Sequence, residues 1–496
     1  MDNLREKTFK GYKWTSILVA SNVFVNSIIL ISLGYLLNTD EIGLRAIILF
    51  LIGLARTLSE FGISQALIQR QENNSSELNA LFTFNIAIGL VMAGVMYILA
   101  VPLSLFYQHA ELIPLVHLTS IVFLVEPLSL VFVALLERNM NFKVLAKLNL
   151  IRLVVNGTFT IITAYIGWGE YSFVVGQLIS TIVFTLFIAT YFKIWGDWFP
   201  KFTIRILYVK PYLNFGIFIS GKSFVNYFSR NFDELVIGKM FGMEILGIYH
   251  FAKQVIDRII DSTVQVTSKV TYPIFCNMTR DSKDNAVFNL YYLKLSHVVG
   301  TFGFPVFSLL IVLIPQLLPI MFSNKWDQSI FIMQIFCAKG LVDIISAGFA
   351  TNSLYAFNKT KWAFYTDLTL LPVRVLMMYF ACLVNINLVA VSYTLFVLLK
   401  AGVLQSLVNK LTGIKYKYYL RTLSKPLLAS SLITSCLLYL IQNSWPIYWL
   451  VISTIGFILL YIALMLLWDR QIILEIMNEA KKILKKKNKV QGTEVA

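Results

Sequence analysis

The sequence predicts an all-α polytopic membrane protein with about 14 transmembrane helices. Of its 496 residues, 57% are hydrophobic and only 14% are charged, a composition that cannot cover the surface of a soluble protein. Fourteen spans of about 20 residues would use roughly 280 positions, which is close to the hydrophobic fraction. Almost no polar sequence remains outside the spans, so a large water-soluble catalytic domain is excluded.

Six apolar stretches make up the first half of the chain, and each is long enough to cross a bilayer as a helix. The first follows a basic N-terminus, but it is too long for a secretion signal and lacks a small-residue cleavage site. The six stretches lie near residues 14–37, 43–63, 80–106, 115–136, 150–166 and 173–194.

A polar connection separates these from six further stretches, and two last stretches precede a lysine-rich tail. The second group lies near residues 212–236, 245–274, 295–318, 330–355, 368–384 and 388–408, and the last two near 427–442 and 447–468. We therefore expect four parts: an N-terminal six-helix lobe at 1–195, a C-terminal six-helix lobe at 196–410, two additional transmembrane helices at 411–468 and a cytoplasmic basic tail at 469–496.

Lysine and arginine segregate between alternate connections. One side of the predicted membrane receives 29 of them, and the other receives only Lys239 and Lys325. Basic residues collect on the cytoplasmic side of membrane proteins, which predicts that both termini lie in the cytoplasm. The formal charge of +16 is then a topology signal, and nucleic-acid binding is not expected.

Because each half has an even number of spans, both halves enter the membrane in the same direction. They would then be related by an axis along the membrane normal, an arrangement found in transporters. A weak repeat supports it, because segments 36–43 and 240–247 both end in Glu, one or two apolar residues and Gly. Gly43 and Gly247 would each allow a tight turn. Gly238 and Gly242 form a small-xxx-small pair that would let helix backbones approach closely.

Two motifs resemble those of a known family, the Wzx-type polysaccharide and O-antigen flippases of the multidrug/oligosaccharidyl-lipid/polysaccharide exporter superfamily. Segment 60–70, which reads EFGISQALIQR, is similar to the family's F-G-x-x-x-A-L-I-Q-R. Thr39 departs from the family, where Pro is common in the first outer turn. The second motif consists of Asn231, Asp233, Ile237, Gly238, Gly242, Leu246, Gly247, Tyr249 and Ala252.

The resemblance implies translocation of a polyprenyl-pyrophosphate-linked oligosaccharide across the cytoplasmic membrane by alternating access, for cell-surface polysaccharide or lipopolysaccharide export. The implied partners are this lipid-linked oligosaccharide, membrane lipids, and a polysaccharide polymerase with its export machinery. A physical argument agrees with it. Exposing one unpaired hydroxyl to hydrocarbon costs about 4–8 kcal/mol, so a sugar repeat needs a water-lined path.

Charged residues inside the predicted spans indicate such a path. Eleven Lys and Arg residues lie at or within spans, and each costs about 2.5–3.5 kcal/mol at a helix centre, so most should face a hydrated cavity. Basic residues outnumber acidic ones there, which suits an anionic ligand, and Arg suits phosphate in particular. A polar face of the eighth span, spaced by three or four residues, comprises His250, Lys253, Asp257, Asp261, Gln265 and Ser268.

We expect ten residues to contact the pyrophosphate or the sugars: Asn26, Arg45, Arg56, Lys222, Asn226, Arg230, Lys253, Arg258, Lys339 and Arg374. Two alternatives stay open. Lys253 with Asp257, and Lys339 with Asp343, could simply be i,i+4 pairs inside a bundle. Arg45 and Arg152 could instead lie at the membrane edge with their charges in the headgroup region.

The candidates for ion coupling are Glu60, Asp257 and Asp261, and Asp261 is the best of them because no basic residue lies four positions before it. No phosphate-binding glycine loop, zinc-ligand spacing, nucleophile elbow or catalytic carboxylate pair occurs in the sequence. We therefore expect no enzymatic activity, no cofactor, no metal and no catalytic residue.

Two other functions remain to be weighed. A small-molecule antiporter of the multidrug type would share the twelve-span repeat, but an exporter of cations should prefer an acidic cavity. A membrane-bound polysaccharide polymerase or ligase would act on the same lipid carrier. Such enzymes usually carry a substantial outer loop, whereas the outer loops here are all short.

Overall fold

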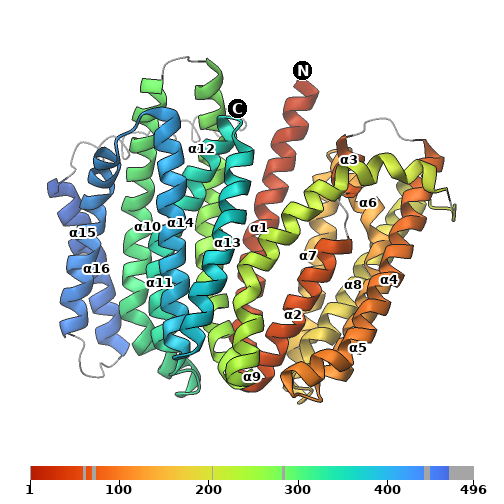
Figure 1. The fold of residues 1–496 in the computed structure, drawn as a ribbon, viewed down its shortest axis with the longest axis horizontal. Coiled ribbons are helices and arrows are strands. Elements are labelled where there is room, and N and C mark those ends of the chain that lie inside the picture. The colour runs from red at the N-terminus through yellow and green to blue at the C-terminus, as the bar shows by residue number, and fades with distance from the viewer. Residues whose placement is uncertain are drawn as a thin grey trace, which may run out of the picture. The chain divides into compact units, whose positions relative to one another are not determined.

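The computed structural model describes residues 2–59, 63–69, 74–203, 205–281, 285–440 and 447–468, and every regular element within these ranges is a helix (Figure 1). This confirms the predicted all-α class. The helices are α1 (Asp2–Leu36), α2 (Thr39–Ser59), α3 (Ile63–Gln69), α4 (Ser75–Tyr107), α5 (Leu112–Val125), α6 (Pro127–Arg138), α7 (Phe142–Tyr165), α8 (Tyr171–Trp195), α9 (Ile206–Asp281), α10 (Asn285–Phe322), α11 (Ser329–Ile345), the π-helical turn η1 (Ser346–Ala350), α12 (Thr351–Ala356), α13 (Thr360–Cys382), α14 (Ile386–Thr412), α15 (Tyr416–Leu440) and α16 (Ile447–Trp468).

Many of these helices are suited to a bilayer. Within the described ranges, nine are long and apolar enough to cross a membrane, and the bent pair α5 and α6 adds a tenth candidate. As far as the description reaches, each of the fourteen predicted stretches lies in one helix or in consecutive helical segments. The protein is therefore a multi-pass membrane protein, while the number of fourteen crossings stays a prediction.

Outward-facing apolar side chains support the same conclusion. On α4, Leu90, Ile98 and Leu105 are exposed by 58%, 72% and 74%, and their spacing of eight and seven residues places them on one helical face. An apolar face of this size is unfavourable in water and favourable against lipid chains. The face therefore marks α4 as a lipid-contacting helix.

The fourth predicted span is broken in the middle. The helices α5 and α6 meet at Glu126 with a bend of 45°. Pro127 begins α6 and has no N–H to continue the hydrogen-bond ladder, which explains the break. Helix α4 packs against the bend at Gly89, where a Cβ atom would lie 2.5 Å from the carbonyl oxygen of Phe123. Only glycine allows this close approach.

The chain forms two compact units, which we describe separately. The first comprises Met1–Val255 with Asp367–Val389, and the second comprises Ile256–Thr366 with Ala390–Ala496. In the first unit, α7 packs against α8 and α1, and a buried core forms around Leu67, Leu81, Phe132 and Ile188. In the second, α10 packs against α11 and α15, and Ile433, Phe457 and Met465 form a smaller core. The four-part division predicted from the sequence stays a prediction.

Candidate functional site

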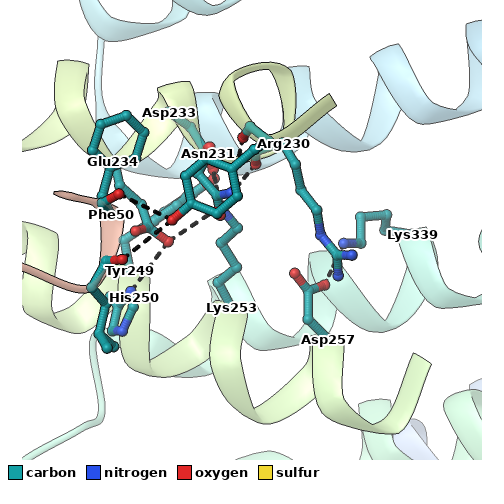
Figure 2. Close-up of polar contacts among 12 residues, drawn as sticks. Phe50, Arg230, Asn231, Asp233, Glu234, Tyr249, His250, Lys253, Asp257 and Lys339 are labelled. Carbon is teal, nitrogen blue, oxygen red and sulfur yellow. Dashed lines mark hydrogen bonds and ion pairs between the residues drawn. The ribbon is translucent and has the colours of Figure 1, made fainter. Parts of the chain in front are cut away.

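A buried polar network joins the two arms of α9 on either side of Gly242. Asp233 and Glu234 lie before this glycine, and Tyr249, His250 and Lys253 lie after it (Figure 2). Gly242 has φ 86° and ψ 176°, a backbone conformation that interrupts the helix and that only glycine adopts without strain. The sequence thus turns at Gly242 and brings the acidic residues of one arm onto the basic residues of the other.

Lys253 is the centre of this network. Its Nζ lies 2.8 Å from Oδ2 of Asp233 and 3.2 Å from Oε1 of Glu234. The hydroxyl of Tyr249 donates to the same Asp233 oxygen at 2.7 Å, and Nδ1 of His250 lies 3.1 Å from Oε1 of Glu234. All five residues are buried, so the contacts replace the hydration that these groups lose.

A second helix of the same unit contributes a guanidinium. Arg374 of α13 is 7% exposed, and its Nη2 lies 3.5 Å from Oδ1 of Asp233. The same nitrogen donates to the carbonyl oxygen of Arg230 at 3.3 Å, and Nζ of Lys253 donates to that carbonyl at 3.3 Å. Two carboxylates therefore face two cations, which makes the network electrically balanced when His250 is neutral.

The glycines of the second motif have different roles from those predicted. Gly242 forms the turn, and nothing lies within 4 Å of a Cβ atom placed on it, so the prediction that it allows close helix packing was wrong. Gly247 lies inside the helix after the turn, where an added Cβ would lie 1.7 Å from the carbonyl oxygen of Thr39. An added Cβ on Gly43 would likewise lie 2.0 Å from the carbonyl oxygen of Met243. The two glycines of the repeat thus permit contact between backbones, not turns.

A second charged cluster lies at the bend between α5 and α6. Oε1 of Glu126 lies 2.7 Å from Nη2 of Arg56 and 3.2 Å from Nη2 of Arg152. The Glu126 side chain is 12% exposed, whereas that of Arg56 is 38% exposed. Arg152 also donates to the hydroxyl of Thr181 at 3.3 Å, so its guanidinium is held between two helices.

In the second unit, Lys339 is paired with two acids. Its Nζ contacts the carboxylate of Asp257, and Oδ2 of Asp343 lies 3.8 Å away. Lys339 is buried, and the rings of Phe336 and Tyr393 also lie near its Nζ. The predicted i,i+4 pair of Lys339 with Asp343 is therefore present. The described contacts of Lys253 and Asp257 instead run to other helix segments, to Asp233 with Glu234 and to Lys339 respectively.

The other predicted residues lie at varied depths. Arg45 is buried, and its Nη1 donates to Oε1 of Gln254 at 3.3 Å. Nδ2 of Asn26 donates to the carbonyl oxygen of Asn22 within α1. Lys222 is half-buried, whereas Asn226 and Arg230 are exposed.

The predicted ion-coupling residues also have neighbours. Arg258 interacts electrostatically with Asp261 three positions later, a spacing that the sequence argument left out when it favoured Asp261. Asp257 is held by Lys339. Glu60 lies outside the described residues. Asp257 and Asp261 thus each have a cationic neighbour.

Sequence reasoning missed two acids. Glu126 lies in the middle of an apolar stretch directly before Pro127, and this Glu-Pro pair was the available signal for a broken span. Glu234 follows Asp233 inside a predicted span, where two adjacent carboxylates must find cations or water. In the structure Glu126 contacts Arg56 and Arg152, and Glu234 contacts Lys253 and His250.

One group among the described residues brings metal-ligand atoms together. Ligand atoms of Asp40, His109 and Glu111 lie within 4.8 Å of one another, at the ends of α2 and α4 that the sequence predicts outside the membrane. Glu170 lies near this group. Its own burial, and then the negative charges of Glu111, Glu41 and Asp40, raise the pKa of the Glu170 carboxyl. Glu111 is exposed, and water can solvate the group without an ion.

Comparison with known sequences gives a consistent result. The profile of a family described as "Polysaccharide biosynthesis protein" matches residues 33–331. The lipopolysaccharide biosynthesis protein WzxC of Escherichia coli (strain K12) is 29% identical over 342 residues, which cover 68% of each chain. The teichuronic acid biosynthesis protein TuaB of Bacillus subtilis (strain 168) is 24% identical over 368 residues, which cover 74% of this chain and 75% of that one.

Solved structures share the fold. The lipid II flippase MurJ in an inward closed conformation superposes with a TM-score of 0.75 at 15% identity, covering 94% of this chain and 100% of that chain. An inward-facing multidrug transporter of the MATE family and the MOP superfamily gives a TM-score of 0.53 at 13% identity, covering 84% of this chain and 94% of the other. The family match spans more than half of the sequence, and the chain therefore belongs to the polysaccharide biosynthesis protein family, as its motifs predicted.

Proposed function

We propose that this protein is a flippase that moves a polyprenyl-pyrophosphate-linked oligosaccharide across the bacterial cytoplasmic membrane for cell-surface polysaccharide export. The family match over residues 33–331 carries the proposal. The names of the relatives support it, since they refer to lipopolysaccharide and teichuronic acid biosynthesis. The fold supports it as well, because it is shared with a lipid II flippase.

The first arm of α9 supports an anionic substrate. Lys222, Asn226 and Arg230 are spaced by four residues and so share one helical face, which is exposed at Asn226 and Arg230. A charged side chain costs about 2.5–3.5 kcal/mol at the centre of a membrane helix, so this face favours contact with water over lipid. On such a hydrated face, Lys222 and Arg230 could bind the pyrophosphate, and the amide of Asn226 could hydrogen-bond sugar hydroxyls.

Among the ten predicted contact residues we propose a division of roles. Lys222, Asn226, Arg230 and the partly exposed Arg56 would contact the substrate in this conformation. Lys253, Arg374 and Lys339 are buried against carboxylates, and they would become available when the transporter changes conformation. Asn26, Arg45 and Arg258 would line the path at other stages of transport.

The architecture that fits this function has two six-span lobes, 1–195 and 196–410, which rock about the substrate path. Helices within 411–468 would flank a groove for the polyprenyl tail, and both termini would lie in the cytoplasm. A polysaccharide polymerase would receive the exported lipid-linked glycan, so the protein would transport this substrate without altering it. A multidrug antiporter shares the fold, but the exposed basic face of α9 disfavours the cationic compounds that such proteins export.

Depletion of the protein in its native cell tests the proposal. We expect a polyprenyl-pyrophosphate-linked oligosaccharide to accumulate with its sugars on the cytoplasmic leaflet, where an added membrane-impermeant glycosidase cannot reach them in intact cells. Arg230→Ala should reduce export at least tenfold at unchanged protein abundance, and Lys239→Ala, which removes a lysine at the predicted outer end of the same helix arm, should not. If depletion led to no accumulation of a lipid-linked glycan, the proposal would be contradicted.

A further inference from the structure

One ring nitrogen of His250 contacts a carboxylate, and the other has no hydrogen-bond partner among the described residues. The residue is 3% exposed. Its Nδ1 lies 3.1 Å from Oε1 of Glu234, and among the described residues nothing offers a hydrogen-bond partner to its buried Nε2. Most buried polar atoms in proteins have a hydrogen-bond partner, so an enclosed ring nitrogen without one calls for an explanation.

The contact with Glu234 determines which nitrogen carries hydrogen. An ionised carboxylate can only accept hydrogen bonds, so Nδ1 must donate its hydrogen to Glu234. In the neutral imidazole the other nitrogen then carries no hydrogen and holds a lone pair. Nε2 of His250 is therefore a proton acceptor enclosed by protein.

The ion-pair network that contains His250 is balanced in charge. Asp233 and Glu234 are each in contact with a cation, and the cations are Lys253 and Arg374. A proton added to Nε2 would convert a neutral network into one with a net charge of +1. The titratable and charged groups of the surrounding elements include Asp233, Glu234, Tyr227, Tyr249 and Lys253 of α9, Arg374 and Cys382 of α13, Arg45 and Arg56 of α2, and Tyr107 of α4.

We propose that Nε2 of His250 binds the proton that couples transport to a proton gradient, with the Glu234 carboxylate as counter-ion. The inference rests on the proposed transport function and assigns its energy source. In the coupling step, a proton from water on one side of the membrane adds to the Nε2 lone pair and forms an imidazolium. In the opposite conformation the same proton returns to water on the other side, and no other bond forms or breaks.

The position of His250 links this proton to a conformational change. Glu234 precedes Gly242 and His250 follows it, so their contact crosses the turn of α9. In the closed arrangement a protonated Nε2 would be a buried donor on a cation without an acceptor, which is an unfavourable state. Opening of the network would give that hydrogen a water partner. Proton binding therefore favours separation of the two α9 arms around the network.

His250 also fits this task better than the carboxylates proposed from the sequence. Asp257 is in contact with Lys339, and Asp261 interacts with Arg258, so each already has a cationic partner. His250 faces a carboxylate instead, and imidazole is the side chain whose ordinary titration falls in the physiological range. We therefore assign the coupling proton to the imidazole of His250 and not to Asp257 or Asp261.

Nitrogen NMR of the histidines tests proton binding without any substrate. The full chain has four histidines and can be labelled with ¹⁵N-histidine and studied in lipid nanodiscs, with His250→Gln to assign the His250 signals. We expect the Nδ1–H tautomer at high pH and conversion of Nε2 to the protonated form as the pH falls. An Nε2–H tautomer at high pH, or the absence of titration between about pH 5 and 9, would overturn the proposal.

Reconstituted transport tests coupling. Proteoliposomes would carry the lipid-linked oligosaccharide extracted from depleted cells, with and without an imposed pH difference. One proton per lipid should shift the distribution of the lipid between leaflets about tenfold per pH unit. The shift should disappear in His250→Gln. It should persist in His297→Gln, a buried histidine whose Nδ1 lies 2.7 Å from the carbonyl oxygen of Thr422.

The outcomes separate the two proposals. Flipping by the unmodified protein without a pH-dependent shift, or an undiminished shift in His250→Gln, overturns proton coupling at His250 and leaves the flippase function intact. If no lipid crosses under any condition, the flippase function is contradicted, and coupling with it. The NMR titration still decides, in that case, whether His250 binds a proton.

Discussion

Gly43 and Gly247 occupy corresponding positions of a weak sequence repeat and meet in space. A Cβ atom on Gly247 would lie 1.7 Å from the carbonyl oxygen of Thr39 and 3.0 Å from the backbone nitrogen of Gly43. The neighbouring atoms are backbone, so they cannot move aside as a flexible side chain would. The resemblance of the two octets therefore reflects a point where the beginning of α2 crosses the second arm of α9.

Substitution of Gly247 should be severely destabilising. We expect Gly247→Ala to cost about 3 kcal/mol or more, because overpacking here forces backbone apart. The thermal unfolding midpoint of the purified protein measures this effect. Gly94→Ala on α4 is the matched control, because nothing lies within 4 Å of a Cβ atom there and alanine favours helix by about 1 kcal/mol. Equal midpoints for the two variants would contradict the close approach at Gly247.

Glu126 should be essential as the partner of two arginines. Glu126→Gln removes the carboxylate that contacts Arg56 and Arg152, and removal of one partner from a buried ion pair costs about 3–5 kcal/mol. The added change Arg152→Gln should restore part of this loss, because it removes one uncompensated charge. A double-mutant cycle of unfolding midpoints measures the coupling. Purely additive losses would show that Glu126 and Arg152 do not interact.

The charged residues within the spans could be predicted from sequence, but most of their partners could not. Lys253, Lys339 and Arg374 were identified because they lie within predicted spans, where a charge in hydrocarbon is costly. Their partners depend on which helices meet, as when Arg374 contacts Asp233 from a helix more than a hundred residues later. Only the pair of Lys339 with Asp343 followed from local spacing.

At the scale of elements, α9 shows both what sequence patterns predict and what they miss. Two apolar stretches near 212–236 and 245–274 were expected, and the structure has one helical run with a turn at Gly242 between them. The motif includes Gly242, but the packing role predicted for it was wrong. Spacing of four between Gly238 and Gly242 suggested packing, whereas the backbone conformation of Gly242 is what requires glycine.

Gly242→Ala tests the turn of α9. A Cβ atom there meets no neighbour, so its effect should come from the backbone conformation alone and cost about 1–3 kcal/mol. We expect a lower unfolding midpoint and, since the polar network spans this turn, weaker glycan export. Gly221→Ala in the first arm also meets no neighbour and has no such conformation, so it should be tolerated. If Gly242→Ala were as stable as Gly221→Ala, the turn would not require glycine.

At the scale of the whole molecule, membrane topology is the main expectation left to measure. Lys325 follows α10 and Lys417 lies in the first turn of α15, and three predicted crossings separate them. In a variant without the four native cysteines, Lys325→Cys should react with a membrane-impermeant maleimide in intact spheroplasts, and Lys417→Cys should react only after lysis. Labelling of both from outside would overturn the alternation of spans on which the predicted cytoplasmic termini depend.

The most direct test of the proposed function is lipid transfer by the purified protein alone. Proteoliposomes with the extracted polyprenyl-pyrophosphate-linked oligosaccharide on both leaflets are treated with an impermeant glycosidase, which first removes the outer sugars. A flippase should then deliver the inner half to the enzyme, so that nearly all of the glycan is cleaved, while liposomes with Arg230→Ala lag at least tenfold. Cleavage that stops at about half, in liposomes shown to contain folded protein, would contradict the account.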